Sequence, residues 1–193
     1  MRLVLASASP RRAELLGRLN ADFDIEVSYV DETSCDEADA RRYVTDIACK
    51  KAFAVAKRRK ADDIIVIGAD TIVIAPDGER LGKPADRRDA KRMLGKLSGE
   101  WHVVHTGVAL VCAGQSRNDT GVETTEVKFR DLDDSMIERY LDTGEYPDKA
   151  GAYAVQGYGA VLVEGIRGCY FNVMGFPLAK LADMLGRFGY RFF

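Results

Sequence analysis

Two patterns of hydrophobic residues alternate along the chain. Residues 2–6, which are apolar from Leu3 onward, and residues 64–67, which are apolar throughout, are runs of strand length bounded by small or polar residues. Between them, apolar residues recur every three or four positions, as they do on one face of a helix, first from Pro10 and again over about residues 37–59. Ser9 before Pro10 is a typical helix N-cap. This alternation predicts an α/β fold, with a mixed twisted sheet flanked by helices.

The second half of the chain continues the alternation. We predict that the strand at 64–67 ends at the Gly-Ala-Asp-Thr segment of residues 68–71, and that residues 72–74 continue in an extended conformation. Further helices are expected at about 86–97, at 134–142, and from Pro177 to about 186. Further strands are expected near 101–104, 107–112, 122–129 and 160–163.

Composition narrows the class of protein. The 193 residues are 47% hydrophobic and 30% charged, which suits one globular domain and is compatible with two lobes around a cleft. A formal net charge of −2 argues against a protein that coats nucleic acid, and no apolar stretch approaches the roughly 20 residues of a membrane span. The four cysteines form no C-x-x-C pair, so we expect free thiols, no zinc cage and a cytoplasmic protein.

The first chemical signal follows the first predicted strand. Ser7, Ser9, Arg11 and Arg12 cluster around a helix start, where unpaired N–H groups and the helix dipole favour an anion. Hydroxyl groups and guanidinium groups at this place predict a phosphate site. The alternative is a capped helix with surface arginines, but two arginines in a first turn oppose the dipole at a small cost.

Asp70 and two lysines form the second signal. Asp70 follows an apolar strand and Gly68, where a carboxylate can hold a metal ion or take a proton from water; it is equally compatible with a turn residue. Lys51 shares an otherwise apolar helix face, unlike its exposed neighbour Lys50. Lys83 lies in a turn, and its side chain is long enough to reach a phosphate. Taken alone, a lysine at either position is more often exposed to solvent than functional.

Other polar residues have weaker signals. Glu32 belongs to an acidic pair that, without context, is best interpreted as a charged loop. Gln156 follows a glycine-rich segment and offers both a donor and an acceptor, which suits the edge of a base. His102 and His105 are three residues apart on a predicted strand, so they face opposite ways and are interpreted as structural.

Taken together, these segments resemble the Maf family of nucleotide pyrophosphatases. They occur in the family's order over nearly the whole chain. The matching segments are LASASPRR (5–12), VDE (30–32), KA (51–52), GADT (68–71), GKP (82–84), LSG (97–99), HTG (105–107), DKAGAY (148–153) and QG (156–157).

The resemblance implies a mixed sheet with an active-site cleft between two lobes, and hydrolysis of nucleoside triphosphates between the α and β phosphates. It implies a divalent cation, Mg²⁺ or Mn²⁺, held by Asp70 and Glu32, with Asp70 as the catalytic acid–base residue. The matching substrate-binding positions are Ser7, Arg12, Lys51 and Lys83. Family members are also linked to arrest of cell division and to keeping modified nucleotides out of nucleic acids.

Three positions separate the branches of the family, and here they are Arg11, Thr71 and Gln156. This combination resembles the branch that acts on dTTP and UTP, whereas the branch that prefers 7-methyl-GTP has an aromatic residue, Gln and Glu. A nucleotide-binding regulator of division without turnover is the alternative from another class. A phosphotransferase is disfavoured because the chain lacks G-x-x-x-x-G-K-[ST]. The expected partner is a small nucleotide, with no nucleic acid and no membrane; a homodimer is left open.

Overall fold

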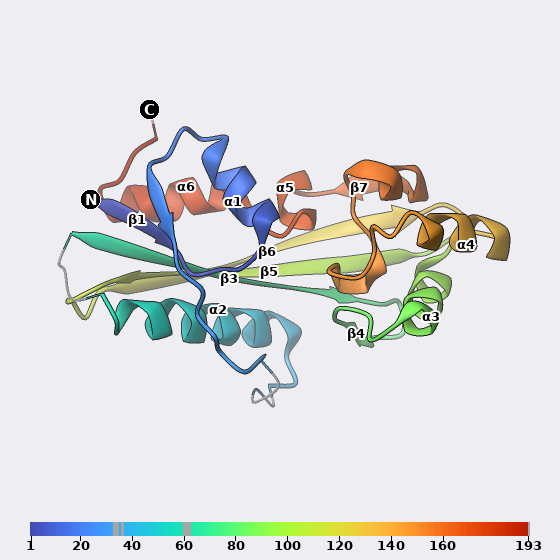
Figure 1. The fold of residues 1–193 in the computed structure, drawn as a ribbon, viewed down its shortest axis with the longest axis horizontal. Helices are drawn as coiled ribbons and strands as arrows, with labels where there is room; N and C mark the ends of the chain where they lie inside the picture. Colours follow the sequence, from blue (N-terminus) through green and yellow to red (C-terminus); the bar gives the residue numbers. More distant parts are fainter. Residues whose placement is uncertain (33–34, 36, 60–62, 193) are drawn as a thin grey trace. The chain divides into compact units, whose positions relative to one another are not determined.

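A mixed β-sheet forms the framework of the chain in the computed structural model, which describes residues 1–32, 35, 37–59 and 63–192. Within these residues the sheet has seven strands, in the order β2-β1-β3-β5-β6-β7 with β4 paired to β3 (Figure 1). The strands are β1 (Arg2–Leu5), β2 (Phe23–Ile25), β3 (Ile64–Ile74), β4 (Arg80–Leu81), β5 (Trp101–Cys112), β6 (Asn118–Phe129) and β7 (Val163–Arg167). β1 runs parallel to both of its neighbours, β2 and β3. β4 runs antiparallel to β3, and β7 runs antiparallel to β6. The predicted α/β class with a mixed sheet is confirmed.

Three of the helices begin at an aspartate that caps them. The helices are α1 (Pro10–Gly17), α2 (Ala40–Ala56), α3 (Arg87–Leu97), α4 (Asp134–Asp142), α5 (Tyr170–Val173) and α6 (Leu178–Arg187), with 3-10 turns η2 (Ala150–Ala152) and η3 (Gly157–Leu162). Asp39, Asp86 and Asp133 cap α2, α3 and α4 by accepting hydrogen bonds from backbone N–H groups of the first turn. None of the helices in the described part of the chain has the length and apolar character needed to cross a membrane.

The chain divides into two compact units. The first comprises Met1–Asp70, Thr106–Glu123 and Gly175–Phe193, and the second comprises Thr71–His105 and Thr124–Met174. In the first unit, α2 covers one face of the sheet while α1 and α6 cover the other (Figure 1).

Two glycines bring α2 unusually close to the sheet of the first unit. A Cβ atom on Gly68 of β3 would lie 2.1 Å from the carbonyl oxygen of Ala48, and one on Gly107 of β5 would lie 2.3 Å from that of Val44. Small side chains such as Ala52 fill the rest of this contact. The backbone of α2 therefore packs directly on β3 and β5, which only glycine at these strand positions permits.

The second unit is built around a cluster of aromatic rings. His102, Phe129 and Tyr153 pack edge to face, with ring centroids 4.7 to 5.4 Å apart. His102 Nε2 lies 2.8 Å from Tyr153 Oη, and burial lowers the pKa of His102 to about 4, so its ring is neutral at pH 7. His105 Nδ1 is 2.9 Å from Thr124 Oγ1. Both histidines thus have the structural contacts that the strand spacing predicts.

Several predicted boundaries are wrong. β3 does not end at residues 68–71 but runs without a break into the extended stretch predicted at 72–74, because Gly68 makes room for a helix instead of breaking the strand. The strands predicted at 101–104 and 107–112 are one strand, β5. Residues 160–162 belong to a 3-10 turn, and the strand starts at Val163. The helix predicted over 37–59 is shorter, since its cap is Asp39.

Candidate active site

Lys51 is the centre of a buried group of charges in the first unit. Its Nζ lies 2.8 Å from Asp70 Oδ1 and 2.8 Å from Glu32 Oε1. Lys51 and Asp70 are 8% and 6% exposed, whereas Glu32 is exposed to solvent. Three residues that are distant in sequence, each predicted for the site, therefore meet at one ammonium group.

The local structure explains why Lys51 reaches Asp70. Side chains alternate along β3, so Asp70 points to the same face as Gly68, the face that α2 covers. Lys51 lies on the buried side of α2, four residues after Ile47 and four before Val55. Because Gly68 lets α2 approach, the lysine turns inward onto the carboxylate.

Burial and charge act on Asp70 in opposite directions. Burial raises the pKa of Asp70 above the ordinary value of a carboxyl group, while the positive charges of Lys51 and Arg12 lower it, and burial is the larger effect. A carboxylate with a raised pKa is a stronger base than one in water. Asp70 is therefore suited to accept a proton, and the two cations keep its ionised form accessible.

Arg12 is fixed by backbone acceptors on the other side of the site. Its Nε donates to the carbonyl oxygen of Gly175 at 2.9 Å, and its Nη1 donates to that of Ala69 at 2.8 Å. Nη1 also lies 3.4 Å from Ser7 Oγ, which accepts the backbone N–H of Ser9 at 3.1 Å. Burial lowers the pKa of Arg12, yet a guanidinium stays charged at any physiological pH. These bonds offset the small cost of placing Arg12 in the first turn of a helix.

Ser9 and Arg11 also lie at the start of α1, next to Arg12 and Ser7. Ser9 is the N-cap of α1 by position, as predicted, but its side chain makes no capping hydrogen bond. Arg11 is half-buried and contributes an electrostatic repulsion that lowers the pKa of Arg12. The start of α1 therefore concentrates positive charge at the point where the helix dipole is also positive.

Comparison with known proteins identifies the family. The model of the family described as Maf-like protein matches residues 2–188. The chain belongs to the Maf family. A relative from Acetivibrio thermocellus is 48% identical over 98% of this chain and 96% of its own length, and its name is dTTP/UTP pyrophosphatase.

Other relatives of this Maf chain carry the same name. The relative from Caldanaerobacter subterraneus subsp. tengcongensis is 49% identical over 97% of this chain and 89% of its own length. The relative from Thermotoga petrophila is 45% identical over 96% of this chain and 88% of its own length. A solved structure of the Staphylococcus aureus Ham1 protein aligns with a TM-score of 0.48 and 13% identity, over 67% of this chain and 72% of that one. A score of this size adds nothing to the family assignment.

The carboxylates of this Maf chain fit a divalent cation that also binds substrate. Among the described residues, no three His, Cys, Asp or Glu side chains gather into a metal cage. Asp70 and Glu32 nevertheless lie close together, since both contact Lys51 Nζ at 2.8 Å; the ammonium group fills the point that they share, so a cation would bind beside it. Mg²⁺ typically takes one or two carboxylates, and phosphate oxygens and water complete its octahedron. The pair suits such a cation.

The other predicted residues of the Maf site lie in the second unit. Thr71 follows Asp70 in β3, so its side chain points to the opposite face of the strand. Lys83 is exposed just after β4, and Gln156 is half-buried just before η3. Their roles in binding and specificity stay predictions. Sequence reasoning missed Gly175 and Ala69, because a carbonyl acceptor has no residue-type signature.

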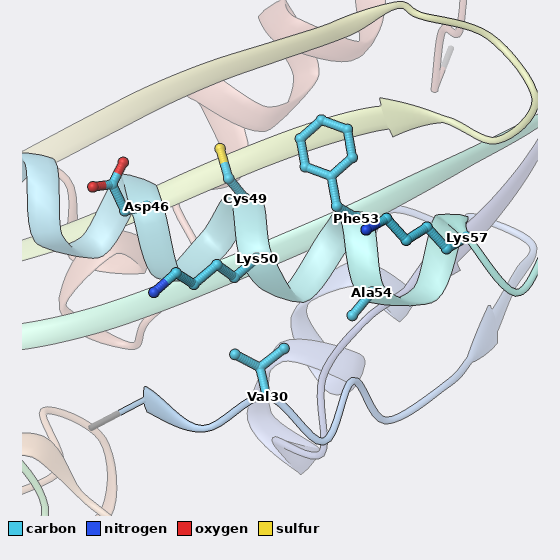
Figure 2. Close-up of a pocket in the computed structure, with 7 residues that line it drawn as sticks. All are labelled: Val30, Asp46, Cys49, Lys50, Phe53, Ala54 and Lys57. Carbon is cyan, nitrogen blue, oxygen red and sulfur yellow. The ribbon is translucent and has the colours of Figure 1, made fainter. Parts of the chain in front are cut away.

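A pocket elsewhere in the first unit contains none of the predicted site residues. It is lined by exposed and half-buried side chains of α2, together with Val30 (Figure 2). The α2 residues are Asp46, Cys49, Lys50, Phe53, Ala54 and Lys57. Lys50 thus points outward while its neighbour Lys51 points inward, which agrees with their predicted difference.

Proposed function

We propose that this protein hydrolyses dTTP and UTP between the α and β phosphates, giving the nucleoside monophosphate and pyrophosphate. The observation that supports it most is the buried Asp70 carboxylate, 2.8 Å from the ammonium group of Lys51. A fold alone would not need this pair, because burying two charges is costly. The names of the relatives supply the substrate class.

The charges of the site suggest how a triphosphate is bound. Arg12 and Lys51 carry two positive charges, and Asp70 and Glu32 carry two negative charges, so the four groups sum to zero. A triphosphate carries about four negative charges, which this set alone does not balance. A divalent cation held by Asp70 and Glu32 would supply two of the missing positive charges and polarise phosphate oxygens. Lys83 and the N-terminus of α1 are the remaining candidates for phosphate contacts.

Asp70 has the chemistry of a general base in this proposal. It takes a proton from a water molecule as the water oxygen forms a bond to the α phosphorus. The bond from the α phosphorus to the bridging oxygen breaks, and its electron pair leaves with pyrophosphate in line with the attack. Lys51 and Arg12 favour the ionised form of Asp70 against the larger effect of burial, and they face the charge of the phosphates.

Base choice is assigned to Arg11, Thr71 and Gln156. Uracil and thymine present an N–H donor between two carbonyl acceptors, and the amide of Gln156 can pair with a carbonyl and the N–H together. We expect the reaction to take place in the cytoplasm, where nucleoside triphosphates are found.

A product assay tests the proposal. The purified protein is incubated with dTTP, UTP, CTP and 7-methyl-GTP in Mg²⁺ or Mn²⁺, and the products are separated and quantified. We expect monophosphate and pyrophosphate in equal amounts, with dTTP and UTP as the best substrates. Asp70→Asn protein, prepared in the same way, controls for contaminating phosphatases.

Release of orthophosphate as the first product would contradict the proposed bond cleavage. A preference for 7-methyl-GTP would contradict the proposed base choice while leaving the reaction type intact. Tight binding of nucleotides without any turnover would favour a regulator instead.

A further inference from the structure

Glu145, just beyond α4 in the second unit, collects three hydrogen bonds in its carboxylate. Its Oε1 accepts the backbone N–H of Tyr158 at 3.1 Å, and its Oε2 accepts that of Gly159 at 2.9 Å. Oε2 also accepts the hydroxyl of Tyr140 at 3.1 Å. Hydrogen bonds to a carboxylate are about twice as strong as those between neutral groups.

Tyr140 extends this contact to the chain before Gln156. Its Oη, which donates to Glu145, accepts the backbone N–H of Ala154 at 3.2 Å. Tyr140 is 4% exposed, and burial together with the charge of Glu145 raises its pKa, so the phenol keeps its proton. Glu145 therefore fixes two N–H groups after Gln156 directly, and one before it through Tyr140.

Two glycines show how closely the chain fits around this carboxylate. Gly157 has φ +78°, and a Cβ atom there would lie 2.0 Å from Glu145 Oε1. A Cβ atom on Gly159 would lie 2.2 Å from the carbonyl oxygen of Ala154. Residues 154–159 thus fold onto themselves and onto Glu145, and only Gln156 among them offers a side-chain amide.

We propose that Glu145 is the positioning residue for base recognition: through the backbone N–H groups of residues 154, 158 and 159, it holds Gln156 where a pyrimidine base is read. This inference rests on the proposed function, in which Gln156 contacts the base. It assigns a role to a residue that the sequence analysis did not single out.

The chemistry of an amide explains why such positioning is needed. The amide of Gln156 can donate to a uracil carbonyl and accept its N–H, but after a half-turn of the amide it can also pair with cytosine. An amide on a mobile backbone would adapt to either base. The half-turn is a rotation within the side chain, so an ordered backbone contributes to discrimination by setting where the amide meets the base.

Two variants test the inference. Glu145→Gln keeps the shape but places an NH₂ group against a backbone N–H, and Glu145→Ala removes the acceptors altogether. Asp142→Asn is the matched control, because Asp142 lies three residues earlier and its carboxylate pairs with Arg87. Each full-length variant is compared with the wild type in thermal unfolding, which excludes a general loss of folding.

Two measurements are made on each variant. Hydrogen exchange of a peptide that covers residues 154–159 reports on backbone order. Dissociation constants for non-hydrolysable α,β-imido-UTP and α,β-imido-CTP report on base discrimination without requiring turnover. We expect faster exchange in this peptide and about a 10-fold loss of the preference for the uridine analogue in both Glu145 variants, and no change in Asp142→Asn.

The outcomes separate the inference from the proposed function. Unchanged exchange in residues 154–159, or faster exchange with unchanged preference, would overturn the positioning role of Glu145. A wild type that binds both analogues equally would overturn it too, since no discrimination would remain to be positioned. A wild type that prefers the uridine analogue but does not hydrolyse UTP would contradict only the proposed function.

Discussion

The surroundings of Asp70 and of Gln156 show two ways of holding a polar side chain. Asp70 lies inside the regular strand β3 and meets Lys51 from the regular helix α2, with a 2.8 Å ion pair between them. Gln156 lies in irregular chain before η3, and the backbone around it is held by hydrogen bonds to the side chains of Glu145 and Tyr140. The first arrangement is rigid because elements pack, whereas the second depends on a few hydrogen bonds.

This difference predicts different responses to substitution. Around Asp70 the scaffold comes from burial and backbone contact, and Lys51 keeps Glu32 as a partner when Asp70 is neutralised, so removing this charge changes the chemistry while the chain stays folded. Around Gln156 the geometry depends on polar contacts, so a polar substitution alters recognition before it alters stability. The four changes below test this contrast, starting with the largest expected effect.

Asp70→Asn removes the proposed base and keeps its shape. We expect kcat for UTP to fall by ~10²-fold or more, because loss of a general base or a metal ligand typically has that effect. The thermal midpoint should change little. Activity within a few-fold of the wild type would reduce Asp70 to a structural residue.

Gln156→Glu tests base recognition on the other side of the comparison. An ionised carboxylate only accepts hydrogen bonds, so it would face the carbonyl groups of uracil or thymine. We expect kcat/KM for dTTP and UTP to fall on the order of 10²-fold, with a smaller fall for 7-methyl-GTP. If the ratio of the three values stays as in the wild type, Gln156 does not select the base.

Lys51→Met tests the electrostatic support of Asp70. The positive charge of Lys51 lowers the pKa of Asp70, so its removal raises that pKa further, and the base becomes protonated at a higher pH. The acid limb of the pH profile of kcat/KM should therefore move to higher pH, and the maximum should fall about 10-fold through the lost contact with phosphate.

Lys50→Met is the matched control for this profile, because Lys50 neighbours Lys51 in α2 but is exposed. Its acid limb should coincide with that of the wild type at the same concentration of divalent cation. An unmoved limb in Lys51→Met would mean that Asp70 does not govern the profile.

Gly68→Ala tests the packing that brings α2 to β3. The added methyl group would meet the carbonyl oxygen of Ala48 at 2.1 Å, so the helix must shift. We expect a loss of about 1–3 kcal/mol in the free energy of unfolding, measured in urea, together with reduced kcat. Gly95→Ala, inside α3 with open space around it, should instead add roughly 0.5–1 kcal/mol. Equal stability of the two variants would contradict the close packing of α2.

Much of the fold follows from periodicity in the sequence. The bounds of α4 and the beginning of α1 agree with the prediction, because each begins at a suitable cap and has a clear apolar face. The strand end predicted at residues 68–71 is wrong, because a glycine within a strand has the same local sequence signature whether the strand breaks there or a helix packs closely against it. The strand predicted at residues 160–162 is also wrong, because a short apolar run there does not distinguish a strand from a 3-10 turn.

The sequence by itself determined the family, the fold class and the candidate residues, because these depend on residue types in a fixed order. Only the tertiary structure decided that Lys51 contacts both Asp70 and Glu32, and that carbonyl groups of Ala69 and Gly175 hold Arg12. It alone decided that Glu145 supports the chain around Gln156. Such contacts join distant segments through backbone atoms, which every residue has, and through helix-to-sheet distances that depend on packing and not on local pattern.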